Sequence, residues 1–106
     1  MKIDDDLEIN QEIKDGICKI TAKGRIDSNN ADFLLEKLLE IIKEGQKVII
    51  LNMAQIEYLS SIGIRVVLKL YKQAMDDGGS FKIESPSKIV KNVLGMVALQ
   101  EMLVAN

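Results

Sequence analysis

Tyr58-Leu59-Ser60-Ser61-Ile62-Gly63-Ile64 is the stretch around which the rest of the chain is organised. An apolar run, Val48-Ile49-Ile50-Leu51, precedes it, and from Arg65 onward apolar residues recur at helical spacing. We therefore expect a short loop to bring two serine hydroxyls to the start of a helix. A helix start exposes unpaired backbone N–H groups and the positive end of the dipole, which suits a serine cap or an added phosphate.

Upstream of this junction, the pattern predicts a β-hairpin followed by a helix. Apolar residues alternate from Leu7 to Ile13 and from Cys18 to Ala22, and Asp15-Gly16 between them is a turn signal typical of hairpins. Cys18 is expected to be a small core residue. Ser28-Asn29-Asn30 offers caps for the helix, which Gly45 is placed to end. The residues expected on its buried face are Ala31, Leu34, Leu35, Leu38, Ile41 and Ile42.

Downstream, two more strands and two more helices are expected. Residues 47–53 form a strand that is apolar on both faces, as in a sheet covered by helices. A helix over residues 61–77 follows and stops at Gly78-Gly79, and residues 81–84 form the next strand. Ser85-Pro86 predicts the start of the last helix, with Ser as the cap and Pro at the first helical position. Its expected buried stripe is Ile89, Val90, Val93, Leu94 and Val97. The tail from residue 99 to residue 106 fits either a short strand or a docked helical turn.

The element order is thus ββαβαβα plus a short tail, which predicts one α/β domain over residues 1–106. Alternating strands and helices imply right-handed crossovers and a mixed, mostly parallel sheet of four to five strands, with helices packed on it and the hairpin as an antiparallel edge. The start of the second helix then lies at the carboxyl ends of the strands, where ligands and partners generally meet such folds.

Composition narrows the function. A net charge of −2 gives no reason to expect nucleic-acid binding, and no apolar run is long enough for membrane insertion. One Cys and no His exclude the usual transition-metal sites and His-dependent triads, and neither common phosphate-binding glycine motif is present. We therefore expect no enzyme activity and no cofactor. The single cysteine and the absence of a signal peptide indicate a cytoplasmic protein.

Four segments carry a family resemblance: Leu51-Asn52-Met53, residues 56–64, Leu70-Tyr71-Lys72-Gln73 and Gly78-Gly79. Together they resemble the anti-sigma factor antagonists, the bacterial branch of the STAS domains. Gly24-Arg25-Ile26-Asp27 resembles the upstream signature of the same family, and the similarity covers nearly the whole chain. The resemblance implies a STAS-like domain that binds an anti-sigma factor and so frees a sigma factor for transcription.

The resemblance also implies a switch. The anti-sigma factor is a serine kinase that phosphorylates the antagonist at the start of the second helix with ATP, and a serine phosphatase reverses the mark. Ser61 matches the acceptor, with Ser60 as its rival. The family usually has an acidic residue where this chain has Ser60, and a small one where it has Ile62. The expected partner-binding residues are Asp27, Asn52, Tyr58, Ser60, Ser61, Ile62, Gly63 and Arg65.

The residues themselves leave a structural role open at each of these positions. The two serines are equally suited to plain capping, and Gly63 indicates a close approach by either a partner or a neighbouring strand. Asp27 fits a cap of the first helix or an acidic patch, and Arg65 fits a phosphate partner or a solvated charge. A non-phosphorylated STAS scaffold in a larger signalling or transport assembly is the alternative function, and a small enzyme is a third.

Overall fold

The computed structural model describes residues 1–96 of the chain. The predicted elements form in the predicted order, and one further strand precedes them. The elements are β1 (Lys2–Asp4), β2 (Leu7–Lys14), β3 (Ile17–Ile26), α1 (Ala31–Lys43), β4 (Val48–Leu59), α2 (Ser61–Asp76), β5 (Ser80–Glu84) and α3 (Lys88–Met96).

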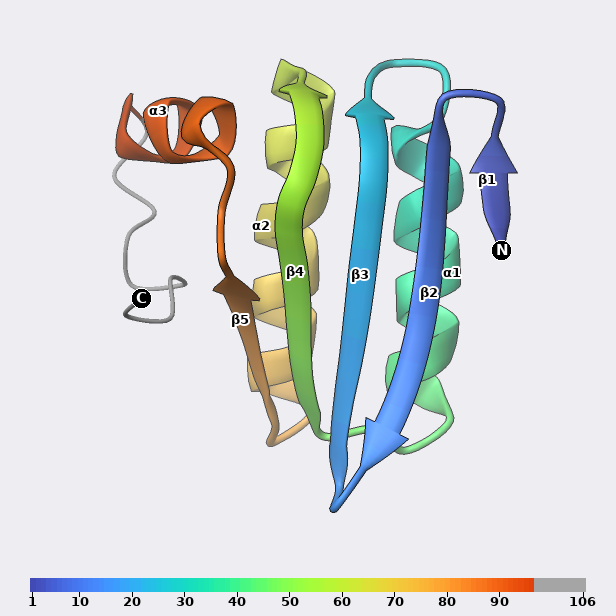
Figure 1. Cartoon of the computed structure of the whole chain (residues 1–106). Coiled ribbons are helices and arrows are strands. Elements are labelled where there is room, and N and C mark those ends of the chain that lie inside the picture. Colours follow the sequence, from blue (N-terminus) through green and yellow to red (C-terminus); the bar gives the residue numbers. More distant parts are fainter. Residues whose placement is uncertain (97–106) are drawn as a thin grey trace.

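The strands form one five-stranded sheet in the order β1-β2-β3-β4-β5 (Figure 1). β1 pairs antiparallel with β2 and β2 with β3, whereas β3, β4 and β5 run parallel. The sheet is mixed, as predicted, but half of its strand pairs are parallel, not most of them. The difference arises from β1, because Lys2-Ile3-Asp4 is too short to show a period-2 pattern in the sequence.

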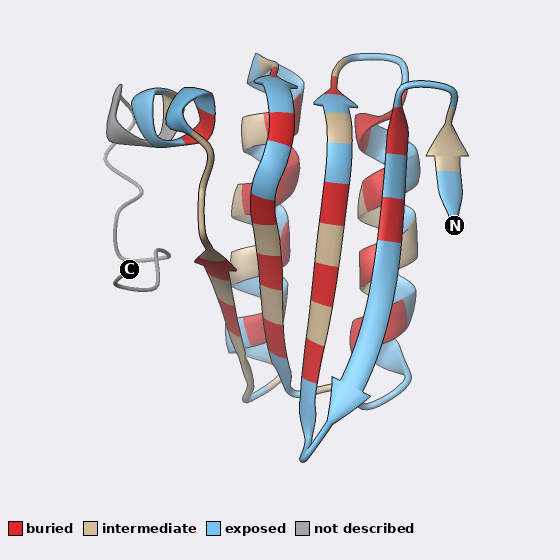
Figure 2. Cartoon of the chain, in the orientation of Figure 1, coloured by how far each residue is buried: buried red, intermediate tan, exposed pale blue. Residues whose placement is uncertain are grey.

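Both long helices lie on the same face of the sheet, and α3 lies beyond the end of β5 (Figure 1). Alternate residues of the central strands point toward α1 and α2 and are buried, which gives the banded pattern of Figure 2. In the described residues no helix covers the opposite face, where Ile17 is 40% exposed and Val48 36%. The prediction that helices cover both faces of the strand at residues 47–53 is therefore wrong.

α1 matches its sequence pattern closely. Five of its six predicted core residues are buried, and Leu35 packs against the core in a half-buried position. Gly45 follows the helix with φ +101°, the left-handed conformation expected of a glycine at this position. Cys18 is also in the core, where burial raises the pKa of its thiol. These core predictions are confirmed.

β4 is longer than predicted because its second half is bulged. Two irregularities in the β3–β4 register each give β4 one extra residue, one before Gln55 and one before Tyr58. Beyond Met53 the buried residues therefore recur at every third position, at Ile56 and Leu59, and not at every second. No loop separates strand from helix, since β4 ends at Leu59 and Ser60 alone connects it to α2.

Three further details differ from expectation. Ile13 and Ile89 are 52% and 38% exposed, so neither is a core residue. α3 is capped by Ser87, whose Oγ accepts a hydrogen bond from Val90 N–H at 3.3 Å. Ser85 has φ +49° and precedes the helix together with Pro86, so this Ser-Pro pair lies before the first turn.

The predictions for Leu94 and Val97 and for residues 99–106 fall outside the described side chains. Within residues 1–96, no helix combines the length and the apolar character needed to cross a bilayer.

Candidate functional site

Ser60 is the N-cap of α2 and ties the helix to the sheet. Its Oγ accepts a hydrogen bond from Gly63 N–H at 3.1 Å, and its carbonyl accepts one from Ile64 N–H at 3.0 Å. Its own N–H donates to the carbonyl of Ile26, the last residue of β3, at 2.9 Å. Ser60 is half-buried, so its hydroxyl is committed to holding the first turn in place.

Ser61 is the first residue of α2, and it is exposed. Within the part of the chain that the structure describes, its hydroxyl has no hydrogen-bond partner. Ser60 satisfies the N–H groups of Gly63 and Ile64, which leaves those of Ser61 and Ile62 at the helix start. The first turn contains no acidic residue. The positive end of the α2 dipole therefore has no anionic side chain in its own first turn to balance it.

Gly63 owes its place to the sheet beneath it. A Cβ at this position would lie 2.6 Å from Leu59 Cδ1 and 2.8 Å from Ile26 Cγ2, well inside van der Waals contact. Gly63 is buried, so the close approach that its sequence position indicates is made by the neighbouring strands. Because Gly63 has no side chain, the first turn of α2 packs directly against β3 and β4. This close packing fixes the position of Ser61 relative to the sheet.

Asp27 lies at this same end of the sheet, because the residue before it accepts the hydrogen bond from Ser60. Its Oδ1 accepts from Asn29 N–H at 2.9 Å in the turn before α1. Asp27 therefore orders the turn and does not cap the helix, whose N-cap position belongs to Asn30. Asp27 is half-buried, and the hydrogen bond of its carboxylate is exposed. It shares this end of the sheet with the start of α2 because each follows the end of a strand.

Asn30 was not predicted as a site residue, yet it organises this corner. Its side chain is fully buried, with Oδ1 accepting from Asp27 N–H at 2.9 Å. Its Nδ2 donates to the Arg25 carbonyl at 2.9 Å and to Asp4 Oδ1 at 3.2 Å. The sequence offered Asn30, with Ser28 and Asn29, as a cap of this helix; Asn30 occupies the N-cap position, but its side chain makes no capping hydrogen bond to α1. Asn30 thereby joins β1 to the connection between β3 and α1.

Three exposed side chains surround the junction. Tyr58 is 38% exposed and carries the guanidinium of Arg25 over its ring, 4.5 Å from the ring centroid. Ile62 is 37% exposed in the first turn of α2. Arg65 is also exposed and follows Ser61 by four residues, so both side chains lie on one face of the helix.

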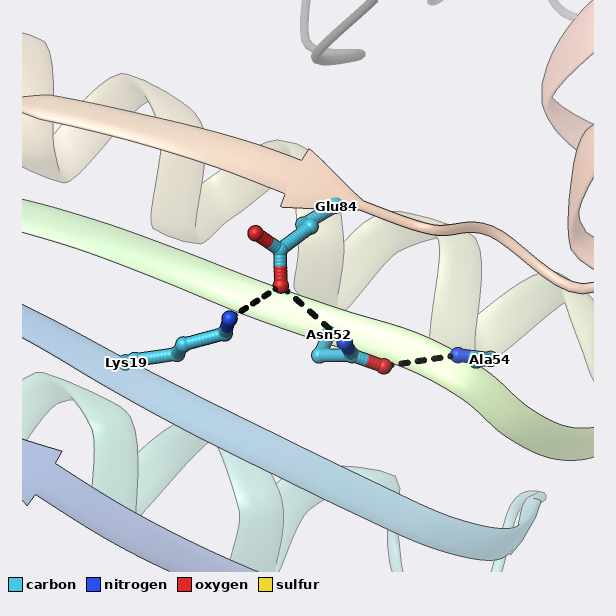
Figure 3. A network of polar contacts seen from close by, with 4 residues as sticks. All are labelled: Lys19, Asn52, Ala54 and Glu84. Carbon is cyan, nitrogen blue, oxygen red and sulfur yellow. Dashed lines mark hydrogen bonds and ion pairs between the residues drawn. The ribbon is translucent and has the colours of Figure 1, made fainter. Parts of the chain in front are cut away.

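Asn52 does not join the junction. Its Nδ2 donates to Glu84 Oε2 at 3.0 Å and its Oδ1 accepts from Ala54 N–H at 3.0 Å, on the sheet face that no described helix covers (Figure 3). Lys19 completes this network with an ion pair to the same Glu84 oxygen at 2.7 Å. The hydrogen bonds from Lys19 and Asn52 hold the pKa of the Glu84 carboxyl below its usual value.

The sheet register shows how far this network lies from the start of α2. Asn52 pairs with Thr21, whereas Leu59 pairs with Ile26 five residues farther along β3. At about 3.3 Å per residue, that separation is roughly 16 Å.

A hollow whose charged residues are mostly acidic opens beside Gly24 of β3. It has a volume of about 520 Å³ and lies between the β1–β2 turn and the bulged part of β4. Its charged lining residues are Lys2, Asp4, Asp5, Asp6, Glu8, Lys23 and Glu57. Carboxylates outnumber ammonium groups, so the hollow favours cations on an approaching molecule.

Comparison with known proteins connects this geometry to a family. The STAS domain profile matches residues 8–105. The Anti-sigma-B factor antagonist of Bacillus subtilis is 25% identical over 99 residues, which are 92% of this chain and 90% of that protein. BtrV of Bordetella bronchiseptica is also named as an anti-sigma factor antagonist, and it is 30% identical over 67 residues. That match spans 63% of this chain and 58% of BtrV.

Solved structures share the fold. An anti-sigma factor antagonist from Mycobacterium paratuberculosis superposes with a TM-score of 0.84 at 16% identity, covering 94% of this chain and 86% of its own. SpoIIAA in its unphosphorylated form gives a TM-score of 0.81 at 20% identity, covering 93% and 89%. SpoIIAA of Bacillus has also been solved in a phosphorylated form, with a TM-score of 0.74. The five-stranded sheet and its helices are thus a STAS-like α/β fold. The chain belongs to the STAS domain family.

Proposed function

We propose that this chain is an anti-sigma factor antagonist that is switched by phosphorylation of Ser61. Unmodified, it binds an anti-sigma factor that is also a serine kinase, and so leaves a sigma factor free for transcription. Phosphate transfer from ATP to Ser61 ends the binding, and a serine phosphatase restores it. In this proposal the chain is a binding protein and performs no catalysis. The names of both relatives and of the structural neighbours support the antagonist role.

The observation that carries the site assignment is the contrast between the two serines. Ser61 is exposed and its hydroxyl has no partner in the described residues, whereas the Ser60 hydroxyl accepts a hydrogen bond from Gly63 and is half-buried. A kinase must bring the acceptor oxygen in line with the γ-phosphate of ATP. Ser61 meets this requirement without any change in the fold, but Ser60 would have to leave its cap.

The start of α2 also explains why the isolated domain would tolerate the phosphate. Phosphorylation adds about −1.5 to −2 charges and three strong acceptor oxygens. The N–H groups of Ser61 and Ile62 and the dipole of α2 favour an anion there. Arg65 stands one turn farther on the same face and adds a cation. We therefore expect the phosphorylated chain to remain folded.

A partner that packs against the neutral hydroxyl has no such compensation. Its surface would have to desolvate a near-dianion or face it with like charge, which costs several kcal/mol. Since about 1.4 kcal/mol corresponds to a tenfold change in Kd, even part of this cost would release the partner. Ile62 at 37% exposure supplies the apolar contact next to the hydroxyl that such an interface needs.

The test is phosphate transfer from ATP by purified anti-sigma factor kinases of the source organism, beginning with any kinase encoded beside this gene. We expect one phosphate per chain, located on Ser61 by tandem mass spectrometry and absent in Ser61→Ala. Label confined to Ser60 would overturn the site assignment. Stable capture in a multi-protein complex with no phosphate on either serine would favour the non-phosphorylated scaffold instead.

A further inference from the structure

Tyr58, an expected partner-binding residue, forms an exposed pair with Arg25, which was not among the expected site residues. They are direct partners in the β3–β4 register, and the Arg25 guanidinium lies 4.5 Å from the centroid of the Tyr58 ring. Both side chains are exposed. Arg25 immediately precedes Ile26, whose carbonyl anchors Ser60, and Tyr58 lies two residues before Ser60. The pair is therefore continuous with the junction.

Local backbone features hold the two side chains together. Arg25 N–H donates to the Asp6 carbonyl at 2.9 Å, and the Arg25 carbonyl accepts from Asn30 Nδ2 at 2.9 Å. The extra β4 residue between Ile56 and Tyr58 shifts the register so that Tyr58, and not Glu57, stands opposite Arg25. Bulges often redirect a side chain in this way beside functional surfaces.

The chemistry of the pair indicates what it binds. A guanidinium that stacks on a ring keeps its N–H edge available, and that edge matches a carboxylate in bidentate geometry. No carboxylate among residues 1–96 forms an ion pair with Arg25. Stacking also pre-orders the long side chain, which reduces the entropy lost on binding. Arg and Tyr, together with Trp, are the residue types enriched among the residues that dominate interface energies.

The surroundings limit the partner to an isolated acidic group. The chain is acidic overall, and most of the charged residues that line the hollow beside Gly24 are carboxylates. A polyanion would be repelled from this region, whereas one carboxylate can pair with one guanidinium. We propose that Arg25 and Tyr58 are the contact site for a segment of the anti-sigma factor that carries a single Asp or Glu. This inference rests on the proposed function.

Binding of the purified anti-sigma factor kinase by calorimetry tests the proposal. We expect Arg25→Glu to raise Kd at least 30-fold and Arg25→Lys about 5-fold, because lysine keeps the charge but loses the fork. Lys14→Glu changes the charge equally at the far end of the sheet and should stay within 2-fold. Tyr58→Phe keeps the ring and should stay within 3-fold, whereas Tyr58→Leu should lose about 10-fold.

The outcomes separate the two proposals. If no anti-sigma factor kinase binds the wild-type chain, both fail. If wild type binds and Arg25→Glu binds equally well or more tightly, only the carboxylate contact fails. Thermal unfolding of each variant supplies the remaining distinction. A lower midpoint for Arg25→Glu with unchanged Kd would assign the pair to sheet stability alone and overturn the proposal.

Discussion

Replacing each serine of the junction by alanine tests whether Ser60 caps α2 while Ser61 contributes little to stability. Ser60→Ala removes the Oγ that accepts the Gly63 N–H at 3.1 Å and leaves that donor in a part-buried position. Loss of an N-cap costs about 1 kcal/mol, within a range of about 0.5–2 kcal/mol. For a chain of this size, about 1 kcal/mol lowers Tm by roughly 4–8 °C. Ser61→Ala removes an exposed hydroxyl without a described partner, so its effect should stay within about 0.5 kcal/mol.

Urea unfolding followed by far-UV circular dichroism measures both variants under the same conditions. We expect a lower midpoint with an unchanged m-value for Ser60→Ala, because only the folded state loses an interaction. Ser61→Ala should superpose on wild type. Equal destabilisation by both substitutions, or a larger loss for Ser61→Ala, would refute the reasoning. Ser60→Asp provides a further control, since aspartate caps as well as serine and should retain wild-type stability.

Three other predictions concern the frame around the junction. Asn30→Ala should lower the free energy of unfolding by about 3 kcal/mol, because it leaves the Asp27 N–H and the Arg25 carbonyl without their partner; a loss under about 1 kcal/mol in urea titration would contradict this. Gly24→Ala should cost at least about 2 kcal/mol, since φ is +116° and a Cβ would lie 2.0 Å from the Asp6 carbonyl oxygen; Gly16→Ala, at φ +80° in open space, should cost only about 1 kcal/mol. The lowered pKa of Glu84 means that its ion pair stabilises the fold above about pH 4.5 and is lost as pH falls below that value. The free energy of unfolding of wild type should therefore exceed that of Glu84→Gln by up to about 1 kcal/mol at pH 7, and the two should converge in acid. A constant difference at all pH values would argue against the pair.

Regular periodicities in the sequence predicted most of the fold. The buried stripe of α1, the hairpin turn at Asp15-Gly16 and the start of α2 each depend on contacts within a few residues, which the sequence displays directly. Asp27 and Ser60 lie at the same end of the sheet because each follows the end of one of two parallel strands. The resemblance to STAS domains added the expectation that the junction is a switch.

The failures have non-local causes. The bulges of β4 change the period of buried residues from two to three. The residues from Met53 to Leu59 do not by themselves indicate these bulges, which arise in the pairing with β3. Asn52 lies away from the junction because the register places it opposite Thr21, and its Nδ2 donates to Glu84, which comes from another strand and pairs with Lys19. Asn30 bonds to Asp27 and Arg25 within five residues, but its link to β1 is made to Asp4, 26 residues away, and so could not be read from its neighbours.

The most direct test of the central claim is the affinity of the anti-sigma factor kinase for the stoichiometrically phosphorylated chain compared with the unmodified chain. The account predicts a Kd at least tenfold higher after phosphorylation, with an unchanged circular dichroism spectrum, because the charge acts at the interface and leaves the fold intact. Equal affinities would contradict it, and so would weaker binding accompanied by loss of the α2 helix.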